Sequence, residues 1–261
     1  MKCSSCTTDT GSVDREQAVV QLGGVRDDFV VALAGNPNTG KSTVFNALTG
    51  LRQHTGNWPG KTVTRAEGLF TYSDKRFRLI DLPGTYSLLA GSTDEEIARD
   101  YLLFGRPDCT VVVCDATVLE RNLYLALQIL EITDRVVLCV NLMDEADRKR
   151  IALEARVLEK ELGVPVVPTA ARRGQGLDRL LKHIHEVASG RAVNQPKRAT
   201  LNPEAEAAIE QLVPSLLALI PDLPCPRWIA IRLLEGDERV AEALQNGELR
   251  ALAAGRAEAA A

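Results

Sequence analysis

The sequence predicts an α/β domain with a mixed six-stranded sheet flanked by helices, followed by a small all-helical domain. From Phe29 onward, short β-rich runs alternate with helical stretches, which is typical of a largely parallel sheet covered on both faces. After Gly190 no strand pattern returns, and apolar residues recur at helical spacing. We divide the 261 residues into a polar leader (1–28), the α/β domain (29–190), a linker (191–203) and the helical domain (204–261).

Six runs rich in β-branched and other apolar residues are the expected strands. They span residues 29–34, 68–72, 76–82, 110–115, 136–141 and 165–169. The second and third runs are joined by the short turn 73–75, so we expect them to form an antiparallel hairpin. This hairpin makes the predicted sheet mixed.

Helices are expected between most of these strands, and again in the helical domain. In the α/β domain they span residues 41–49, 93–104, 120–132, 151–162 and 177–188. In the helical domain, apolar residues at helical spacing over 209–220 predict a helix that Pro214 kinks or restarts. Two further helices are expected over 228–234 and 238–252.

Composition excludes several classes of protein. The chain has 31 basic and 35 acidic residues, a net charge of −4, so no global positive field is available for nucleic acid, and no nucleic-acid partner is expected. No apolar run approaches the roughly 18–20 residues that span a bilayer, which predicts a soluble, cytosolic chain. Cys3 and Cys6 form a lone CxxC with no further ligands nearby, which favours a reduced terminus over a metal site.

A phosphate-binding motif follows the first strand directly and opens the first helix. Its eight residues match G-x-x-x-x-G-K-[ST] in full. Its glycines let backbone N–H groups curl around a phosphate, and the helix N-terminus adds positive potential. We expect Lys41 to bridge the β- and γ-phosphates and the Ser42 hydroxyl to bind Mg²⁺. The predicted nucleotide-binding residues here are Gly35, Asn36, Pro37, Asn38, Thr39, Gly40, Lys41, Ser42 and Thr43.

A second motif, Asp81-Leu82-Pro83-Gly84, ends the strand that follows this unit. An Asp at this place reaches Mg²⁺ through water, and the N–H of Gly84 can meet the γ-phosphate. Both residues therefore join the predicted site.

Two further segments predict guanine as the base. Asp144 of Asn141-Leu142-Met143-Asp144 follows a buried strand, and its carboxylate can accept hydrogen bonds from guanine N1 and N2, where adenine has no donors. Asn141 is expected to tie this loop to the phosphate loop. Thr169-Ala170 follows the last strand, and the N–H of Ala170 can donate to guanine O6. All these segments lie at strand carboxyl ends, where open α/β sheets bind ligands.

With these motifs the chain resembles the TRAFAC-class small G proteins, which have the P-loop GTPase fold. Within them it is similar to the N-terminal cytosolic region of the bacterial ferrous-iron transporter FeoB. The resemblance covers roughly residues 29–240 and leaves the leader unmatched. It is carried by Gly56-Asn57-Trp58-Pro59-Gly60-Lys61-Thr62-Val63-Thr64, by Asp81–Ser87 (Asp-Leu-Pro-Gly-Thr-Tyr-Ser), by Asp115-Ala116 with Glu120-Arg121-Asn122-Leu123-Tyr124, and by 226–237.

The resemblance implies roles that the motifs alone do not. Thr62 matches the switch I threonine that closes on Mg²⁺ and the γ-phosphate. Thr85 stands where Ras-like proteins carry a water-orienting Gln. In this the chain resembles GTPases that lack the Gln and work with K⁺ instead, and Asn38 matches the K⁺ ligand of those proteins. The implied catalytic residues are thus Lys41, Asn38, Thr62 and Gly84, with Mg²⁺ and K⁺ as cofactors. For Asn38 a simple turn role is the alternative.

The implied function is a GTP-binding and GTP-hydrolysing switch domain of a ferrous-iron transporter at the cytoplasmic side of the bacterial inner membrane. Its partners would be GTP or GDP and a transmembrane iron-permease part of the same native chain. Small accessory proteins and a second copy of the chain, in a homo-oligomer, are further candidate partners. A stand-alone GTPase of ribosome or tRNA maturation is one alternative, although residues 191–261 lack the basic cluster of such proteins. A nucleotide-gated binding module with negligible turnover is another.

Overall fold

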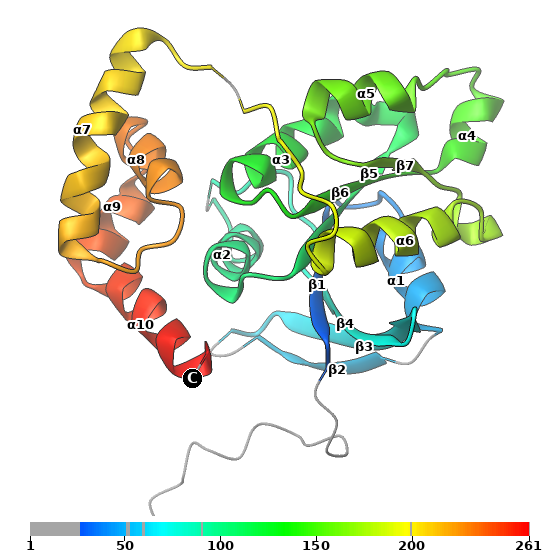
Figure 1. The fold of residues 1–261 in the computed structure, drawn as a ribbon, viewed down its shortest axis with the longest axis horizontal. Helices are drawn as coiled ribbons and strands as arrows, with labels where there is room; N and C mark the ends of the chain where they lie inside the picture. The colour runs from blue at the N-terminus through cyan, green and yellow to red at the C-terminus, as the bar shows by residue number, and fades with distance from the viewer. Residues whose placement is uncertain (1–26, 51–52, 59–60, 90, 199, 261) are drawn as a thin grey trace, which may run out of the picture.

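A seven-stranded mixed sheet forms the centre of the α/β domain (Figure 1). The computed structural model describes residues 27–50, 53–58, 61–89, 91–198 and 200–260, so Cys3 and Cys6 lie outside the described residues. The strand order is β2-β3-β4-β1-β5-β6-β7, and β3 runs antiparallel to both β2 and β4 while the other pairs are parallel. The strands are β1 (Phe29–Gly35), β2 (Gln53–Asn57), β3 (Thr64–Tyr72), β4 (Lys75–Asp81), β5 (Cys109–Asp115), β6 (Val136–Asn141) and β7 (Val166–Pro168).

The predicted count of six strands is wrong, because β2 adds a seventh at the edge of the sheet. Its sequence, Gln-His-Thr-Gly-Asn, has no apolar alternation, and residues 54–57 are exposed. The strand is held by backbone pairing with β3, from Gln53 opposite Gly68 to Asn57 opposite Thr64. A strand that buries no side-chain face leaves no hydrophobic pattern in the sequence. The predicted β3–β4 hairpin is confirmed.

Helices cover both faces of the sheet. The apolar side chains of α1 and α6 pack on one face, and those of α2, α3 and α5 pack on the other. The expected helix 93–104 is α-helical only to Asp100 and continues as a π-helix, η1 (Tyr101–Gly105). The helices of this domain are α1 (Lys41–Thr49), α2 (Thr93–Asp100), α3 (Leu119–Ile132), α4 (Met143–Arg148), α5 (Ala155–Leu162) and α6 (Leu177–Ala188).

The helical domain contains α7 (Pro203–Leu219), α8 (Pro226–Leu234), α9 (Glu238–Gln245) and α10 (Glu248–Ala260). Pro214 lies inside α7 without restarting the helix. The single helix expected over 238–252 is divided in two near Gly247, whose φ of 82° favours glycine. No helix in the described part of the chain is long and apolar enough to cross a membrane.

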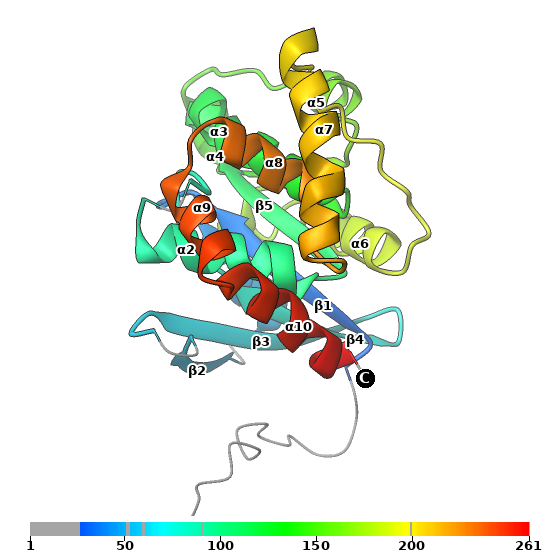
Figure 2. The same ribbon diagram turned by 90° about the vertical axis from the view of Figure 1, so that its left-hand side faces the viewer.

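The helical domain lies beside α2 and α3 of the α/β domain (Figures 1 and 2). Its buried side chains, Trp228 and Leu216 among them, belong to the same apolar cluster as those of α2 and α3. The Cys225 thiol donates to the carbonyl of Ile132 at 3.0 Å. The two domains therefore share a continuous apolar core, and the helical domain is docked.

Candidate nucleotide-binding site

The phosphate loop lies between the end of β1 and the start of α1. Gly40 precedes α1 with a φ of 79°, and a side chain there would collide with the amide of Asn141. Asn38 also adopts the left-handed conformation, with a φ of 66°, and its side chain is exposed. This is the conformation expected of a turn residue, and the role of Asn38 toward K⁺ stays a prediction.

Asn141 joins the two halves of the site. Its Nδ2 donates to the carbonyl of Thr39 in the phosphate loop at 3.1 Å, and its Oδ1 accepts the N–H of Ala171 at 3.0 Å. The predicted tie from this loop to the phosphate loop is confirmed. Because one side chain bonds both loops, the base-recognition segments are held in register with the phosphate loop.

Lys41 is paired inside the site. Its Nζ forms an ion pair with Asp81 and donates to the carbonyl of Leu82 at 2.8 Å. Burial raises the pKa of the Asp81 carboxyl, and the Lys41 charge offsets this effect only in part. A phosphate that takes Lys41 would therefore release a carboxylate that burial makes costly to leave unpaired.

The side chains next to this ion pair are suited to Mg²⁺. The side chain of Ser42 is exposed in the first turn of α1. The residue before it, Lys41, forms the ion pair with the Asp81 carboxylate. Hydroxyl, carboxylate, phosphate and water oxygens are the ligands Mg²⁺ takes, so the donor set fits. Thr62, the third predicted ligand, has an exposed side chain. Among the described residues no group of three His, Cys, Asp or Glu side chains is placed to hold a metal.

The predicted guanine-selecting carboxylate lies in the first turn of α4. Leu142 precedes this helix in the left-handed conformation, with a φ of 62°. The Asp144 side chain is 14% exposed, and its Oδ2 is 3.2 Å from Nε of Arg173 and 4.0 Å from Arg148. Arg173 was not foreseen as a member of the site. The sequence indicated its membership in the site only by its position, three residues after Ala170.

The N–H of Ala170 is also in use. It donates to the carbonyl of Gln175 at 3.1 Å, and Gln175 returns its N–H to Ala170 at 3.3 Å. Guanine O6 would have to displace the Gln175 carbonyl to accept from Ala170. The donor role of Ala170 stays a prediction, and the loop 170–175 competes for both of the expected base contacts.

The segment 83–89, which we call switch II, packs between the phosphate loop and α3. Gly84 lies against Pro37, and the buried Thr85 donates its N–H to the carbonyl of Gly35 at 3.3 Å. Farther along, the N–H of Leu88 donates to Oε1 of Gln128 at 2.7 Å. Sequence reasoning missed Gln128, because a glutamine on a helix carries no motif.

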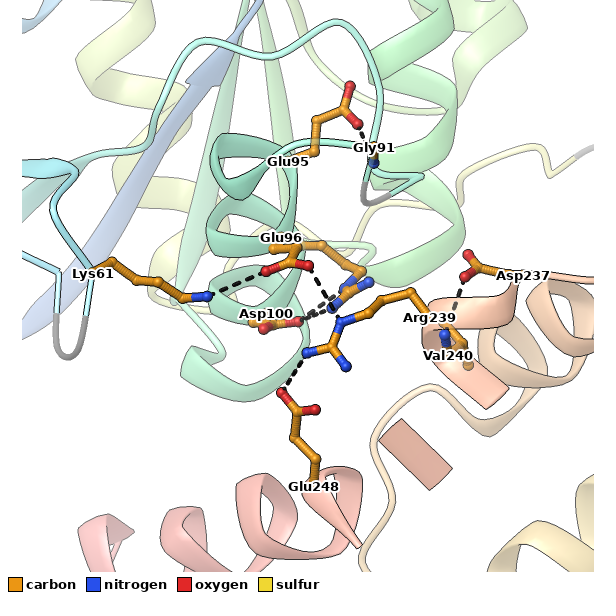
Figure 3. A network of polar contacts seen from close by, with 10 residues as sticks. Lys61, Gly91, Glu95, Glu96, Asp100, Asp237, Arg239, Val240 and Glu248 are labelled. Atoms are coloured by element: carbon orange, nitrogen blue, oxygen red, sulfur yellow. Dashed lines mark hydrogen bonds and ion pairs between the residues drawn. The ribbon is translucent and has the colours of Figure 1, made fainter. Parts of the chain in front are cut away.

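The switch I segment is anchored away from the phosphate loop. Trp58 is 7% exposed, and its ring meets Tyr101 of η1 edge-on at 5.3 Å between centroids. Burial raises the pKa of Tyr101 to about 12. Lys61 reaches Glu96 of α2 at 3.2 Å (Figure 3). The structure thus joins switch I to α2 and η1.

Comparisons with known proteins place this chain. A family model described as ferrous iron transport protein B matches residues 29–184, and one described as the FeoB cytosolic helical domain matches 202–261. The chain belongs to the FeoB family. Its α/β domain is the P-loop GTPase G domain of that family, and residues after it form the family's cytosolic helical domain.

Relatives in the FeoB family are much longer than this chain. The Fe(2+) transporter FeoB of Shigella flexneri is 40% identical over 215 residues, which are 80% of this chain and 27% of that protein. The Fe(2+) transport protein A/FeoB fusion protein of Porphyromonas gingivalis is 42% identical over 80% of this chain and 25% of its own length. The matched part of the chain spans about a quarter of the length of these curated relatives.

Solved FeoB cytosolic domains have the same fold. That of Thermotoga maritima in a GDP form is 38% identical with a TM-score of 0.78, covering 90% of this chain and 94% of its own. That of Legionella pneumophila is 34% identical with a TM-score of 0.76, covering 86% and 87%. The mixed sheet and the helical domain described above are thus shared with FeoB cytosolic domains.

Proposed function

We propose that this FeoB-family chain binds and hydrolyses GTP as the cytosolic switch domain of a ferrous-iron transporter. The observation that carries the proposal is the Asn141 side chain, which bonds Thr39 of the phosphate loop and the N–H of Ala171. This links a phosphate-binding loop to a carboxylate, Asp144, that can read a guanine. The GDP and GMPPNP forms of the T. maritima domain support a guanine nucleotide as the ligand.

Each part of the nucleotide has its own set of protein groups. The backbone of the phosphate loop and Lys41 bind the β- and γ-phosphates, with Lys41 leaving Asp81 to do so. Ser42 and Thr62 would hold Mg²⁺ directly and Asp81 would hold it through water. The ion supplies positive charge that neutralises the phosphates when bound. Gly84 offers its N–H to the γ-phosphate.

The hydrolytic step needs a stabiliser other than a glutamine. Thr85 is buried and too short to orient water as a glutamine does. Asn38 exposes a side-chain oxygen on the phosphate loop, where a K⁺ ion would meet the charge that develops on the phosphates. Residues Lys41, Asn38, Thr62 and Gly84 are therefore the proposed catalytic group, with Mg²⁺ and K⁺ as cofactors.

The names and lengths of the relatives support a proposal for the cellular role. Because they are named as Fe(2+) transporters and are about three times as long as this chain, we propose a membrane permease part beyond this region, with Fe²⁺ as its substrate. The chain would then lie at the cytoplasmic side of the bacterial inner membrane. The fusion relative makes a small accessory protein a reasonable partner, and a homo-oligomer stays part of the proposal.

Exchange of Asp144 for Asn tests the base assignment. Two guanine donors would lose their acceptor at about 1–3 kcal/mol each, so Asp144→Asn should weaken GDP and GTP binding by about tenfold or more. Xanthine carries an oxygen in place of the N2 amino group, so XDP should bind the variant better than GDP does. Glu145→Gln is the control, because Glu145 lies next in α4 with an exposed side chain. Undiminished GDP binding by Asp144→Asn, measured by calorimetry, would refute the assignment.

A further inference from the structure

The side-chain amide of Asn36 is buried without a hydrogen-bond partner. Asn36 is the second residue of the phosphate loop and is 3% exposed, yet neither its Nδ2 nor its Oδ1 is bonded within the described residues. Burying an amide without a partner is costly. Native proteins leave few such groups, and those that remain call for a physical reason.

Other buried asparagines in this domain do not share this condition. Asn122 of α3 is equally buried, and its amide accepts the N–H of Asp115 at 3.1 Å and donates to the carbonyl of Val118 at 3.0 Å. Asn141 also uses both polar atoms of its side chain. The unpaired amide of Asn36 is therefore a property of its position and not of buried asparagines in this fold.

Switch II touches the residues on both sides of Asn36. The carbonyl of Gly35 accepts the N–H of Thr85 at 3.3 Å. A side chain built on Gly84 would lie 3.5 Å from the backbone of Pro37. The segment 83–85 thus spans the position of Asn36, and it contains the N–H that is proposed to meet the γ-phosphate.

Two hydrogen bonds fix the backbone of switch II, one beside Asn36 and one at Leu88. The Thr85–Gly35 hydrogen bond, at 3.3 Å, is longer than the usual 2.7–3.2 Å range. The bond from Leu88 to Gln128, at 2.7 Å, is of normal length. Beside Asn36 switch II is thus held by the longer of the two bonds, and a shift of its backbone there would change the groups that face the Asn36 amide.

We propose that Asn36 is a positioning residue for hydrolysis, whose side-chain amide bonds the backbone of 83–85 when switch II adopts its GTP-bound position. This inference rests on the proposed GTPase function. The bond would hold the N–H of Gly84 at the γ-phosphate without Asn36 touching the nucleotide through its side chain. The unpaired amide then favours the GTP-bound arrangement, because only there does it gain a partner.

Removing the side-chain amide of Asn36 should lower the rate of GTP hydrolysis without lowering the stability of the protein. Truncating a hydrogen-bonded buried asparagine lowers the stability of a protein. Truncating an unpaired one removes a polar group whose burial was unfavourable, so stability should not fall. We therefore expect Asn36→Ala and Asn36→Leu, which keeps the branched shape, to melt no lower than wild type without nucleotide. GDP and GMPPNP affinities should stay within about threefold. Single-turnover GTP hydrolysis should fall by about tenfold or more, as for other losses of alignment.

Hydrogen exchange reads switch II without relying on turnover. In wild type, the amides of residues 84–86 should exchange about tenfold more slowly with Mg²⁺-GMPPNP than with Mg²⁺-GDP, and Asn36→Ala should lose this difference. Thr110→Val is the matched control. The Thr110 hydroxyl is also buried and unpaired, but it lies near the amino end of β5, away from the phosphate loop. Thr110→Val should keep the wild-type rate of GTP hydrolysis and the difference in amide exchange between the GMPPNP and GDP forms.

The possible results distinguish a failure of the positioning role of Asn36 from a failure of the proposed GTPase function. Unchanged hydrolysis and unchanged exchange in both Asn36 variants would overturn the positioning role while the GTPase proposal stands. A joint fall in melting temperature and GDP affinity would show that Asn36 only supports the phosphate loop, which also overturns it. A wild-type chain that binds GMPPNP but does not turn over GTP would refute the hydrolytic function, and the exchange comparison would still decide the role of Asn36.

Discussion

Nε of Arg173 lies 3.2 Å from Oδ2 of Asp144, so the carboxylate expected to read guanine is already paired with a cation. The same loop supplies the Gln175 carbonyl that occupies the N–H of Ala170. Both groups that would recognise the base therefore have partners in the 170–175 loop. Nucleotide binding would have to compete with that loop.

Loss of Arg173 should tighten guanine binding. The Arg173 side chain is 57% exposed, and an ion pair at such a site is worth at most about 1 kcal/mol, so Arg173→Ala should lower the GDP dissociation constant by no more than about fivefold. The effect should shrink in high salt. Arg172→Ala is the control for general charge, since in the described structure Arg172 makes no ion pair with Asp144. Weaker GDP binding by Arg173→Ala would show that Arg173 supports the base site instead of competing for it.

Glu96 should make the docking of the helical domain sensitive to acid. Its carboxylate lies between Lys61 of switch I at 3.2 Å and Arg239 of α9 at 3.3 Å, and Arg239 also reaches Glu248 (Figure 3). Burial pushes the pKa of Glu96 upward, but the hydrogen bonds and charges of Lys61 and Arg239 outweigh it and hold the pKa below its ordinary value. The ion pairs therefore stabilise the fold above the ordinary carboxyl pKa and are lost as the pH falls through the lowered one.

The Glu96→Gln variant isolates this contribution. At pH 7 it should melt about 2–4 °C below wild type, and the difference should vanish as the pH falls through the lowered pKa of Glu96. Glu242→Gln, an exposed exchange on α9, is the control. Melting curves from pH 7 to pH 3.5 measure the effect. A difference between wild type and Glu96→Gln that is constant over this range would mean that the charge of Glu96 is not what holds the domains.

GTP turnover should depend on the monovalent cation. A preorganised K⁺ at Asn38 should raise the hydrolysis rate on the order of tenfold over equimolar Na⁺, which is smaller and fits less well. Asn38→Ala should remove most of this difference while nucleotide binding persists. Phosphate release measured in the two salts decides the point. Equal wild-type rates would refute the role of potassium and leave the GTPase proposal intact.

Much of the fold could be predicted because local signals agree with the tertiary structure. The helices Lys41–Thr49 and Leu177–Ala188 begin and end where expected, with left-handed glycines at positions 40, 50 and 176 marking their boundaries. Edge strand β2 and the short α4 were missed, since neither buries a long periodic face. A π-helix at 101–105 and the break near Gly247 depend on packing that no spacing rule describes.

The residues of the candidate site also fall into those that the sequence could predict and those that it could not. The phosphate loop and the Asp144 segment are contiguous motifs, so their residues could be named from the sequence. Arg173, Gln128 and Gln175 act through single contacts between loops and helices that are distant or irregular in the chain. The unpaired amide of Asn36 could not be foreseen either, because an asparagine in a motif carries no sign of whether its partner is present.

The central claim, that this chain is a guanine-specific nucleotide hydrolase, is tested most directly by comparing phosphate release from GTP and ATP. The wild-type protein is measured with Mg²⁺ in K⁺ buffer, with Lys41→Ala as the background because Lys41 is expected to bridge the reacting phosphates. We expect wild type to hydrolyse GTP above this background and ATP hydrolysis to stay at the background level. Equal hydrolysis of both nucleotides, or GTP hydrolysis that Lys41→Ala retains, would contradict it.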